Sequence, residues 1–127
     1  MIYQGSTPKF LVRIKDENGN QIDPSDSQII VEAKIYLYNA INGTIIGKFY
    51  LNTDPEPNTG WIHMTIEEIT ETDKRIQLIL TSAMTKAAQG NSNMIQINLH
   101  FVDPDCPGSV RIDIKKGKFP EITKAVE

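Results

Sequence analysis

Hydrophobic residues occupy every second position in several segments of this chain, and the first of these segments lies near the N-terminus. Phe10, Val12 and Ile14 follow one another at a spacing of two. This period is typical of a half-buried strand, because successive side chains of a strand point to opposite faces. The run ends before Asn18-Gly19, and Asn-Gly after such a run is a strong turn signal. The chain therefore predicts a β-rich domain from its first residues.

The same period recurs in six further segments. These expected strands cover residues 29–38, 44–51, 61–66, 75–80, 94–102 and 110–115. The apolar positions that share one face of each strand are, in chain order, Ile29, Val31, Ala33, Ile35 and Leu37, then Ile45, Phe49 and Leu51, then Ile62, Met64 and Ile66, then Ile76, Leu78 and Leu80, then Ile95, Ile97, Leu99 and Phe101, and finally Val110, Ile112 and Ile114. Residues 39–43 predict a hairpin loop, because Asn and Gly tolerate positive φ.

One short helix is expected between two of these strands. Thr81-Ser82 offers a hydroxyl that can cap a helix, and residues 83–89 are rich in helix formers. Gly90 is a suitable terminator. A single longer helix over residues 72–89 is the alternative. The alternation before Thr81 favours a strand followed by a short helix.

About seven strands with turn signals at spacings of roughly ten residues predict an all-β fold. We interpret it as an immunoglobulin-like β-sandwich of antiparallel strands with one short helix, formed by residues 1–116. Cys106 is the only cysteine, so the domain has no intrachain disulfide. Residues 117–127 have no clear period and are interpreted as a C-terminal tail or docking arm.

Composition narrows the classes of partner. The chain has 127 residues, which suits one domain, and a net charge of −3. Charges are dispersed, and the short basic run at residues 115–118 is interpreted as a solvated strand end, so no nucleic-acid partner is expected. Residues 1–5 carry no basic region before an apolar run. We expect no signal peptide, no transmembrane segment and no membrane partner.

The turn after the first strand resembles a calcium loop in part. Asp16, Asn18 and Asn20 have the spacing of the first three oxygen ligands. However, Gln21 stands at the sixth position, where a calcium hand needs Gly, and Ser27 stands at the twelfth, where it needs Glu. We interpret the segment as a β-turn and predict no metal site.

No catalytic constellation is visible either. His63 and His100 occupy polar positions of two strands, with no further ligand at metal-binding spacing beside either. Cys106 has acidic neighbours and no evident base. The acidic group in residues 67–73 is interpreted as a solvated loop. We therefore predict no catalytic residue, no cofactor and no enzymatic activity; a small hydrolase would need a nucleophile–base pair that is not apparent.

Aromatic residues are the strongest candidates for binding. Tyr36 and Tyr38 share one face of one expected strand, Tyr50 falls on the strand that pairs with it, and Trp61 opens the next. Such residues arise as cross-strand packing pairs, as protein contacts or as a sugar-stacking platform. All three interpretations remain open for these four residues, with Tyr3 as a further member of a sugar platform.

The N-terminal pattern resembles a known family. The turn at residues 5–8, the alternating strand at 10–15, the Asp-Glu-Asn-Gly turn at 16–19 and Ile22-Asp23 are similar to the start of the N-terminal domain of tailed-phage baseplate upper proteins. Gly60, Leu80-Thr81 and Gly90 extend the likeness thinly over most of the chain. The resemblance implies an immunoglobulin-like sandwich in a virion structural protein, without catalytic residues.

Two departures from the family pattern shape the expectation. Residues 24–27 read Pro-Ser-Asp-Ser, where the family usually has Leu-Thr-Gly. The family domain is usually followed by further domains, whereas the sequence ends at Glu127. The resemblance then implies an adaptor, a fibre-anchoring part or a ring-forming part.

The expected function is that of a non-enzymatic phage virion structural protein in a tail, baseplate, collar or capsid decoration. It would be made in the host cytoplasm and bind other virion structural proteins, as a homo-oligomer or ring, through edge-strand pairing and arm docking. The expected arm contacts are Phe119, Ile122 and Val126. The alternative is a carbohydrate-binding or adhesion module on the same sandwich.

Overall fold

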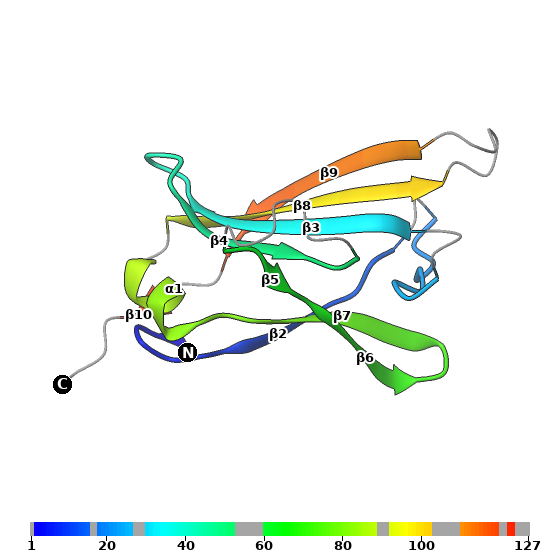
Figure 1. Cartoon of the computed structure of the whole chain (residues 1–127), viewed down its shortest axis with the longest axis horizontal. Helices are drawn as coiled ribbons and strands as arrows, with labels where there is room; N and C mark the ends of the chain where they lie inside the picture. The colour runs from blue at the N-terminus through cyan, green and yellow to red at the C-terminus, as the bar shows by residue number, and fades with distance from the viewer. Residues whose placement is uncertain are drawn as a thin grey trace.

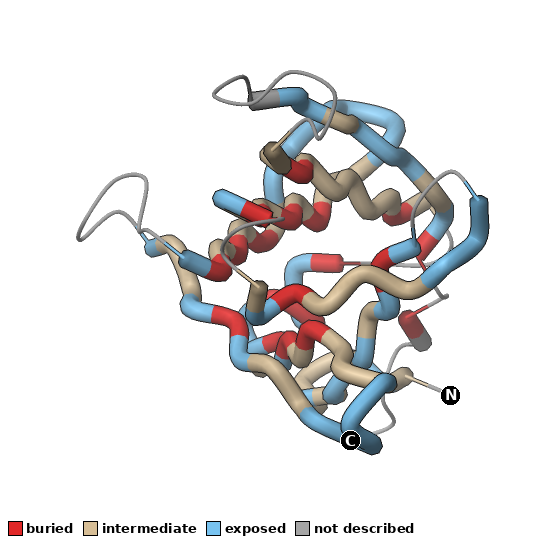
Figure 2. The backbone as a smooth tube through the Cα atoms, turned by 90° about the vertical axis from the view of Figure 1, so that its right-hand side faces the viewer, coloured by how far each residue is buried: buried red, intermediate tan, exposed pale blue. Residues whose placement is uncertain are grey.

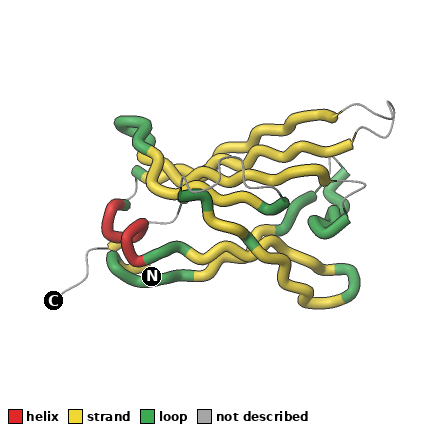
Figure 3. Tube along the Cα trace, in the orientation of Figure 1, coloured by secondary structure: helices red, strands yellow, loops and turns green. Residues whose placement is uncertain are grey.

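The computed structural model describes residues 2–15, 18–26, 30–52, 60–88, 92–102, 110–119 and 122–123. Most of these residues lie in strands, and a single short helix follows the seventh strand (Figure 3). The elements are β1 (Ile2–Tyr3), β2 (Lys9–Val12), β3 (Ile30–Asn39), β4 (Ile45–Tyr50), β5 (Ile62–His63), β6 (Thr65–Thr70), β7 (Asp73–Ile79), α1 (Ser82–Ala87), β8 (Asn93–Val102), β9 (Val110–Lys118) and β10 (Ile122–Thr123).

The longer strands form two sheets that lie in two layers (Figure 1). One sheet has five strands in the order β5-β4-β3-β8-β9, and the other has three in the order β2-β7-β6. Neighbouring strands in these sheets run antiparallel except β4 and β5, which run parallel. The short strands β1 and β10 form a separate parallel pair. A mostly β architecture with one short helix is therefore confirmed.

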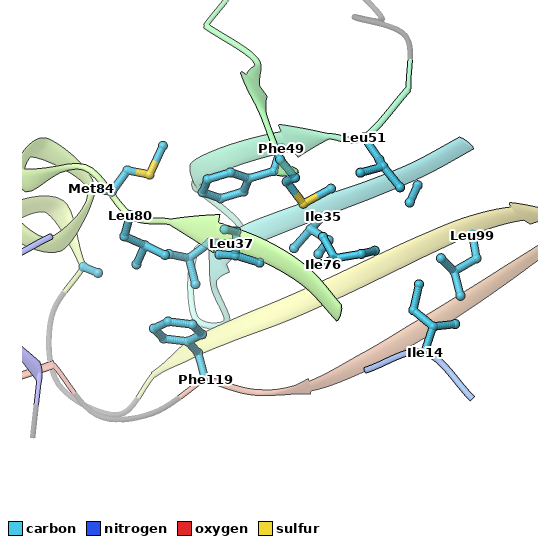
Figure 4. Close-up of a cluster of buried hydrophobic side chains, with 14 of the residues drawn as sticks. Ile14, Ile35, Leu37, Phe49, Leu51, Ile76, Leu80, Met84, Leu99 and Phe119 are labelled. Carbon is cyan, nitrogen blue, oxygen red and sulfur yellow. The ribbon is translucent and has the colours of Figure 1, made fainter. Parts of the chain in front are cut away.

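The hydrophobic core fills the space between the two layers, where buried positions of both sheets face each other (Figure 2). Apolar residues at every second position supply it, as their period predicts: Ala33, Ile35 and Leu37 from β3, Ile76 and Leu78 from β7, and Leu99 from β8. Phe49 of β4 and Met84 of α1 reach into the same cluster (Figure 4).

The chain passes from one sheet to the other at Met64. Residues 61–66 were expected to form one strand, but β5 belongs to the five-stranded sheet and β6 to the three-stranded sheet. Met64 lies between them and is 1% exposed. Ile62 and Ile66 pack against the core on either side, so the expected inward face is confirmed although the strand is divided.

Two irregularities in the ladders reverse the expected orientation of two residues. The register between β3 and β8 shifts between Ile30 and Glu32, so Ile30 is buried and Val31 is exposed. The register between β3 and β4 shifts opposite Ile46, and Ile45 is 52% exposed. Val31 and Ile45 were expected to face the core. A bulge inserts one residue into one strand and so exchanges the faces beyond it.

The described residues of the C-terminal segment, 117–119 and 122–123, are part of the folded body. β9 continues to Lys118, and the Phe119 amide donates a hydrogen bond to the Asn93 carbonyl at 2.9 Å. Phe119 and Ile122 are 6% and 2% exposed. The prediction that these two side chains form free arm contacts is therefore wrong, because this chain's own core already buries them. Val126 lies outside the described residues.

The helix begins where the sequence predicts. The Thr81 hydroxyl accepts a hydrogen bond from the Met84 amide at 3.2 Å, which confirms Thr81 as the N-cap. The fully buried Thr85 hydroxyl accepts from the Gly5 amide at 2.9 Å and donates to the Ser6 carbonyl at 2.8 Å. These two bonds fix the turn after β1 against α1.

Candidate protein-contact face

The side of the five-stranded sheet that faces away from the core is the candidate site, and we call it the outer face. Strand register defines its members, because directly paired residues share a face. Tyr36 pairs with Lys48 on one side and Gln96 on the other. Tyr38 pairs with Ile45 and is the next residue of β3 on this face. The prediction that Tyr36 and Tyr38 share one face of one strand is confirmed.

Trp61 joins this face from the segment that leads into β5. Its indole ring meets the Tyr36 ring edge-on, with 5.4 Å between ring centroids. The Lys48 ammonium lies 5.2 Å from the centre of the indole ring, an arrangement in which the ring's electron-rich face attracts the cation. Both aromatic side chains are half-buried. They therefore pack against each other while keeping part of their surface in solvent.

Tyr50 lies further along the same face. It pairs with Lys34 and His63, and its ring centroid is 5.1 Å from that of His63. A ring nitrogen of His63, Nε2, is within 2.8 Å of the Leu51 carbonyl oxygen. His63 is thus held by backbone and by an aromatic neighbour, which is a structural role.

A shallow hollow lies beside the two tyrosines of β3. Its volume is about 360 Å³. Gly43, in the loop between β3 and β4, forms one wall and has a φ of +73°. The complete lining is Tyr36, Tyr38, Gly43, Ile45, Gln96, Asn98 and Lys116. The Gln96 amide donates to the Asn98 amide oxygen at 2.9 Å, so the floor offers aligned amides between aromatic and aliphatic walls.

Exposed isoleucines extend the outer face to the far edge of the sheet. Ile114 pairs with Asn98 and Ile112 with His100, so both point away from the core. They are 54% and 60% exposed. Their alternation predicts a strand correctly, but their apolar face is directed to solvent, because the register of β9 places Asp113 on the inward side.

A second cluster of functional groups lies on the three-stranded sheet. The Asp73 carboxylate accepts hydrogen bonds from Arg75 at 2.9 and 3.1 Å, from Arg13 at 3.2 Å and from Gln21 at 3.0 Å. The Arg75 bonds, followed by the Gln21 bond, hold the pKa of Asp73 well below its usual range. A carboxylate so strongly held in its charged form is a poor proton carrier at neutral pH. This cluster ties the loop after β2 to β7.

A neighbouring ion pair has the same structural character. The Lys74 ammonium contacts the Asp23 carboxylate at 3.2 Å. The Ser25 hydroxyl, with Ser25's amide and Lys74, lowers the pKa of Asp23.

Other sequence candidates are dispersed. Asn18 and Asn20 lie in the exposed turn after β2, whereas Asp16, Ser27 and Cys106 fall outside the described residues. Glu67 and Glu68 lie in β6 and not in a loop. Within the part of the chain that the structure describes, no group of three or more His, Cys, Asp or Glu side chains is arranged to hold a metal ion. No helix among the described residues is long and apolar enough to cross a membrane.

The structure also adds residues that the sequence did not propose as members of this face. Ile45, Gln96, Asn98 and Lys116 join the tyrosines only through strand pairing. Their polar or apolar alternation was visible, but the pairing partners of each strand were not. Comparison with family models, with curated proteins and with solved structures finds no match to this chain.

Proposed function

We propose that this chain is a non-enzymatic structural protein that works by protein–protein contact through its outer face. One observation carries the proposal: aromatic and aliphatic side chains gather on the solvent side of the larger sheet. Tyr36, Tyr38 and Trp61 lie beside the exposed Ile45. Ile112 and Ile114 are exposed on the same face, across the polar β8 residues Asn98 and His100 with which they pair.

The composition of this face suits a protein partner. Contiguous exposed apolar surface is uncommon on monomeric proteins and marks interaction sites. Tyr and Trp are enriched where interface energy concentrates, because they combine a large apolar area with a polar handle. Lys48 lies over the Trp61 ring and Lys116 lines the hollow, and polar groups around an aromatic cluster are typical of protein interfaces.

We further propose an immunoglobulin-like sandwich of the variable type. The order β5-β4-β3-β8-β9 corresponds to the five strands of the larger sheet in that fold, and β2-β7-β6 corresponds to three strands of its other sheet. The parallel direction of β5 along β4 departs from that pattern. The strand order nevertheless supports the topology that the alternating pattern predicts.

The proposed setting is a tailed-phage virion, in a tail, baseplate, collar or capsid decoration. The resemblance of residues 5–23 to the N-terminal domain of baseplate upper proteins supports this setting. In such a particle the chain is made in the host cytoplasm and its partners are other virion structural proteins, arranged symmetrically. A symmetric particle repeats one contact many times, so a single adhesive face is sufficient.

Side-chain footprinting in purified particles tests both parts of the proposal. Particles from the source of the sequence are exposed to hydroxyl radicals beside the free protein, and oxidation is read by mass spectrometry. We expect the chain at a fixed copy number, with Tyr38 and Trp61 protected in the particle. Tyr3, which is 47% exposed on β1, serves as a reference away from the outer face. Absence of the chain from particles overturns the virion setting, and unchanged oxidation of Tyr38 and Trp61 overturns the contact face.

A second candidate function is carbohydrate binding, and the hollow beside Tyr38 favours it. Aromatic rings beside the Gln96 and Asn98 amides provide both stacking and hydrogen bonding. Titration with a glycan panel by calorimetry tests this function. It predicts saturable binding that Tyr38→Ala and Asn98→Ala abolish and Tyr3→Ala retains; no heat with any glycan eliminates it.

A further inference from the structure

β9 is the longest edge strand of the two larger sheets. Among the described residues, no strand pairs with its outer side. β9 covers Val110–Lys118 and pairs with β8 alone among the described residues. Figure 1 shows it at the margin of the larger sheet, on the far side of β8 from β3. Such an edge presents a row of backbone donors and acceptors that can template another strand.

The side chains of this edge are self-complementary when a second β9 runs antiparallel to it. If Ile114 of the two copies stand opposite each other, Asp113 of each copy falls opposite Lys115 of the other. Asp113 and Lys115 lie on the same side of β9 and are 3.7 Å apart within one chain. Their side chains are 44% and 56% exposed. Opposite charges directly across a strand pair stabilise the pairing, and the symmetry supplies two such pairs.

The residues on the other face of β9 also match those of the second copy in this register. Ile114 meets its own copy at the symmetry axis, and Ile112 falls opposite Lys116. Both isoleucines are more than half exposed in one chain, so pairing removes apolar surface from water. The aliphatic stem of Lys116 can cover Ile112 while its ammonium stays in solvent.

We propose that two copies of the chain associate through their β9 edges, antiparallel, with Ile114 at the two-fold axis. The product is one continuous sheet made from the five strands of each copy. This inference rests on the proposed function, since it identifies a second copy of the chain as one of the partners. It also aligns the two outer faces side by side, with four isoleucines at the seam.

Neighbouring registers are less favourable. A shift that centres the pair on Asp113 sets two carboxylates opposite each other, and a shift that centres it on Lys115 does the same with two ammonium groups. Like charges directly opposite destabilise a strand pair. A register centred on Ile112 sets Arg111 opposite Asp113 but leaves residues 115–118 without a partner among the described residues of the second copy, and Arg111 already lies over its own Phe101 ring at 5.6 Å.

Disulfide trapping tests the register directly. Both variants are made in a Cys106→Ser background, which removes the only cysteine. In the proposed register, Ile114→Cys places two thiols on Cα atoms about 5 Å apart, within disulfide reach. Ile112→Cys, the matched control, places them four positions apart along the strands, which is about 14 Å.

We expect mild oxidation to yield cross-linked dimers of Ile114→Cys and to leave Ile112→Cys monomeric. Equal cross-linking of both variants indicates random collision and overturns the proposal. Preferential cross-linking of Ile112→Cys, or none in either variant, overturns the register. Circular dichroism confirms that each variant retains its β-sheet spectrum before oxidation.

Charge exchange provides a second, reversible test in the natural background. Sedimentation equilibrium measures the dissociation constant of the dimer from the 14.3 kDa chain. We expect Asp113→Lys and Lys115→Glu each to raise it about tenfold or more, because two attractive pairs become repulsive. The double variant, Asp113→Lys with Lys115→Glu, restores the pairs and returns the dissociation constant towards that of the natural chain. Lys86→Glu, at an exposed position of α1 outside the proposed seam, makes the same change of charge; it is the control and has a much smaller effect.

The outcome separates this inference from the proposed function. A natural chain that stays monomeric at all concentrations, while Tyr38 and Trp61 are still protected in particles, overturns the β9 pairing alone. A dimer that follows the charge exchange, in a chain that particles lack, supports the pairing and overturns the virion setting.

Discussion

The ring of Phe10 in β2 packs edge-on against the ring of Phe119, with 4.9 Å between the ring centroids. This contact joins β2 to the residue that follows β9. Ile122 lies in the same core and is 2% exposed. Phe119 and Ile122 are therefore stabilising elements of the fold.

Ile122→Ala is expected to lower the free energy of unfolding by about 2–5 kcal/mol, because it removes buried methyl groups and leaves a cavity. Ile41→Ala is the matched control, since Ile41 is 83% exposed in the loop after β3. Its effect should stay within about 0.5 kcal/mol. Urea denaturation followed by tryptophan fluorescence measures both. Similar midpoints for the two variants would contradict the buried position of Ile122.

Thr85→Val should lower the free energy of unfolding by about 1–3 kcal/mol. The substitution keeps the shape of the side chain but leaves the Gly5 amide and the Ser6 carbonyl without the hydroxyl that each contacts. Thr85→Ser keeps the hydroxyl and loses one methyl group, at about 0.8 kcal/mol. Thermal unfolding of the pair checks the order. A serine variant less stable than the valine variant would show that packing, and not hydrogen bonding, fixes the turn after β1.

Asp73→Asn is expected to change how stability depends on pH. The folded-state pKa of Asp73 lies below its ordinary value because Arg75 and Gln21 donate hydrogen bonds to its charged form. A lowered pKa contributes stability that is present above the unfolded-state value near 4 and is lost as the pH falls through the folded-state value. The natural chain should therefore be more stable than the variant at pH 7, and the difference should shrink steadily below about pH 5.

Urea midpoints at a series of pH values measure that difference. The comparison carries its own control, because all other carboxylates titrate in both proteins. A difference that stays constant down to the lowest pH at which both proteins fold would show that the charge of Asp73 contributes nothing.

Gly43→Ala should destabilise the chain by about 1–2 kcal/mol, because Gly43 has a φ of +73° and a side chain is strained there. Gly117→Ala is the control. Gly117 has no heavy atom within 4 Å of an added Cβ and lies in β9. Its replacement should be neutral or stabilise by up to about 1 kcal/mol through the unfolded state. Chemical denaturation of both variants tests the contrast, and equal losses would indicate a general intolerance of added methyl groups.

Strand alternation predicted most of the fold because it records which face meets the core. Ala33, Ile35 and Leu37 are buried as expected, and so are Ile76 and Leu78. The two-residue period of one strand cannot reveal a bulge, because a bulge is a property of two paired strands. Val31 and Ile45 were therefore assigned to the wrong face.

The candidate face was predictable only in part. Tyr36 and Tyr38 share a face because they are two positions apart, which the sequence states directly. Their contact with Trp61 and their position beside Asn98 depend on which strands become neighbours. Phe119 was misassigned because its segment has no period, although a single aromatic residue can fill a core position without one.

The parallel pairing of β1 with β10 has a mechanical consequence. Ile2 pairs with Ile122 and Tyr3 with Thr123, and the two strands run in the same direction. A force that pulls the two ends of the chain in opposite directions loads this pair along the strands, so its hydrogen bonds resist together instead of opening one at a time. The β1–β10 pair is therefore loaded in shear. Tension applied through the termini reaches the two larger sheets only after the hydrogen bonds between β1 and β10 have broken.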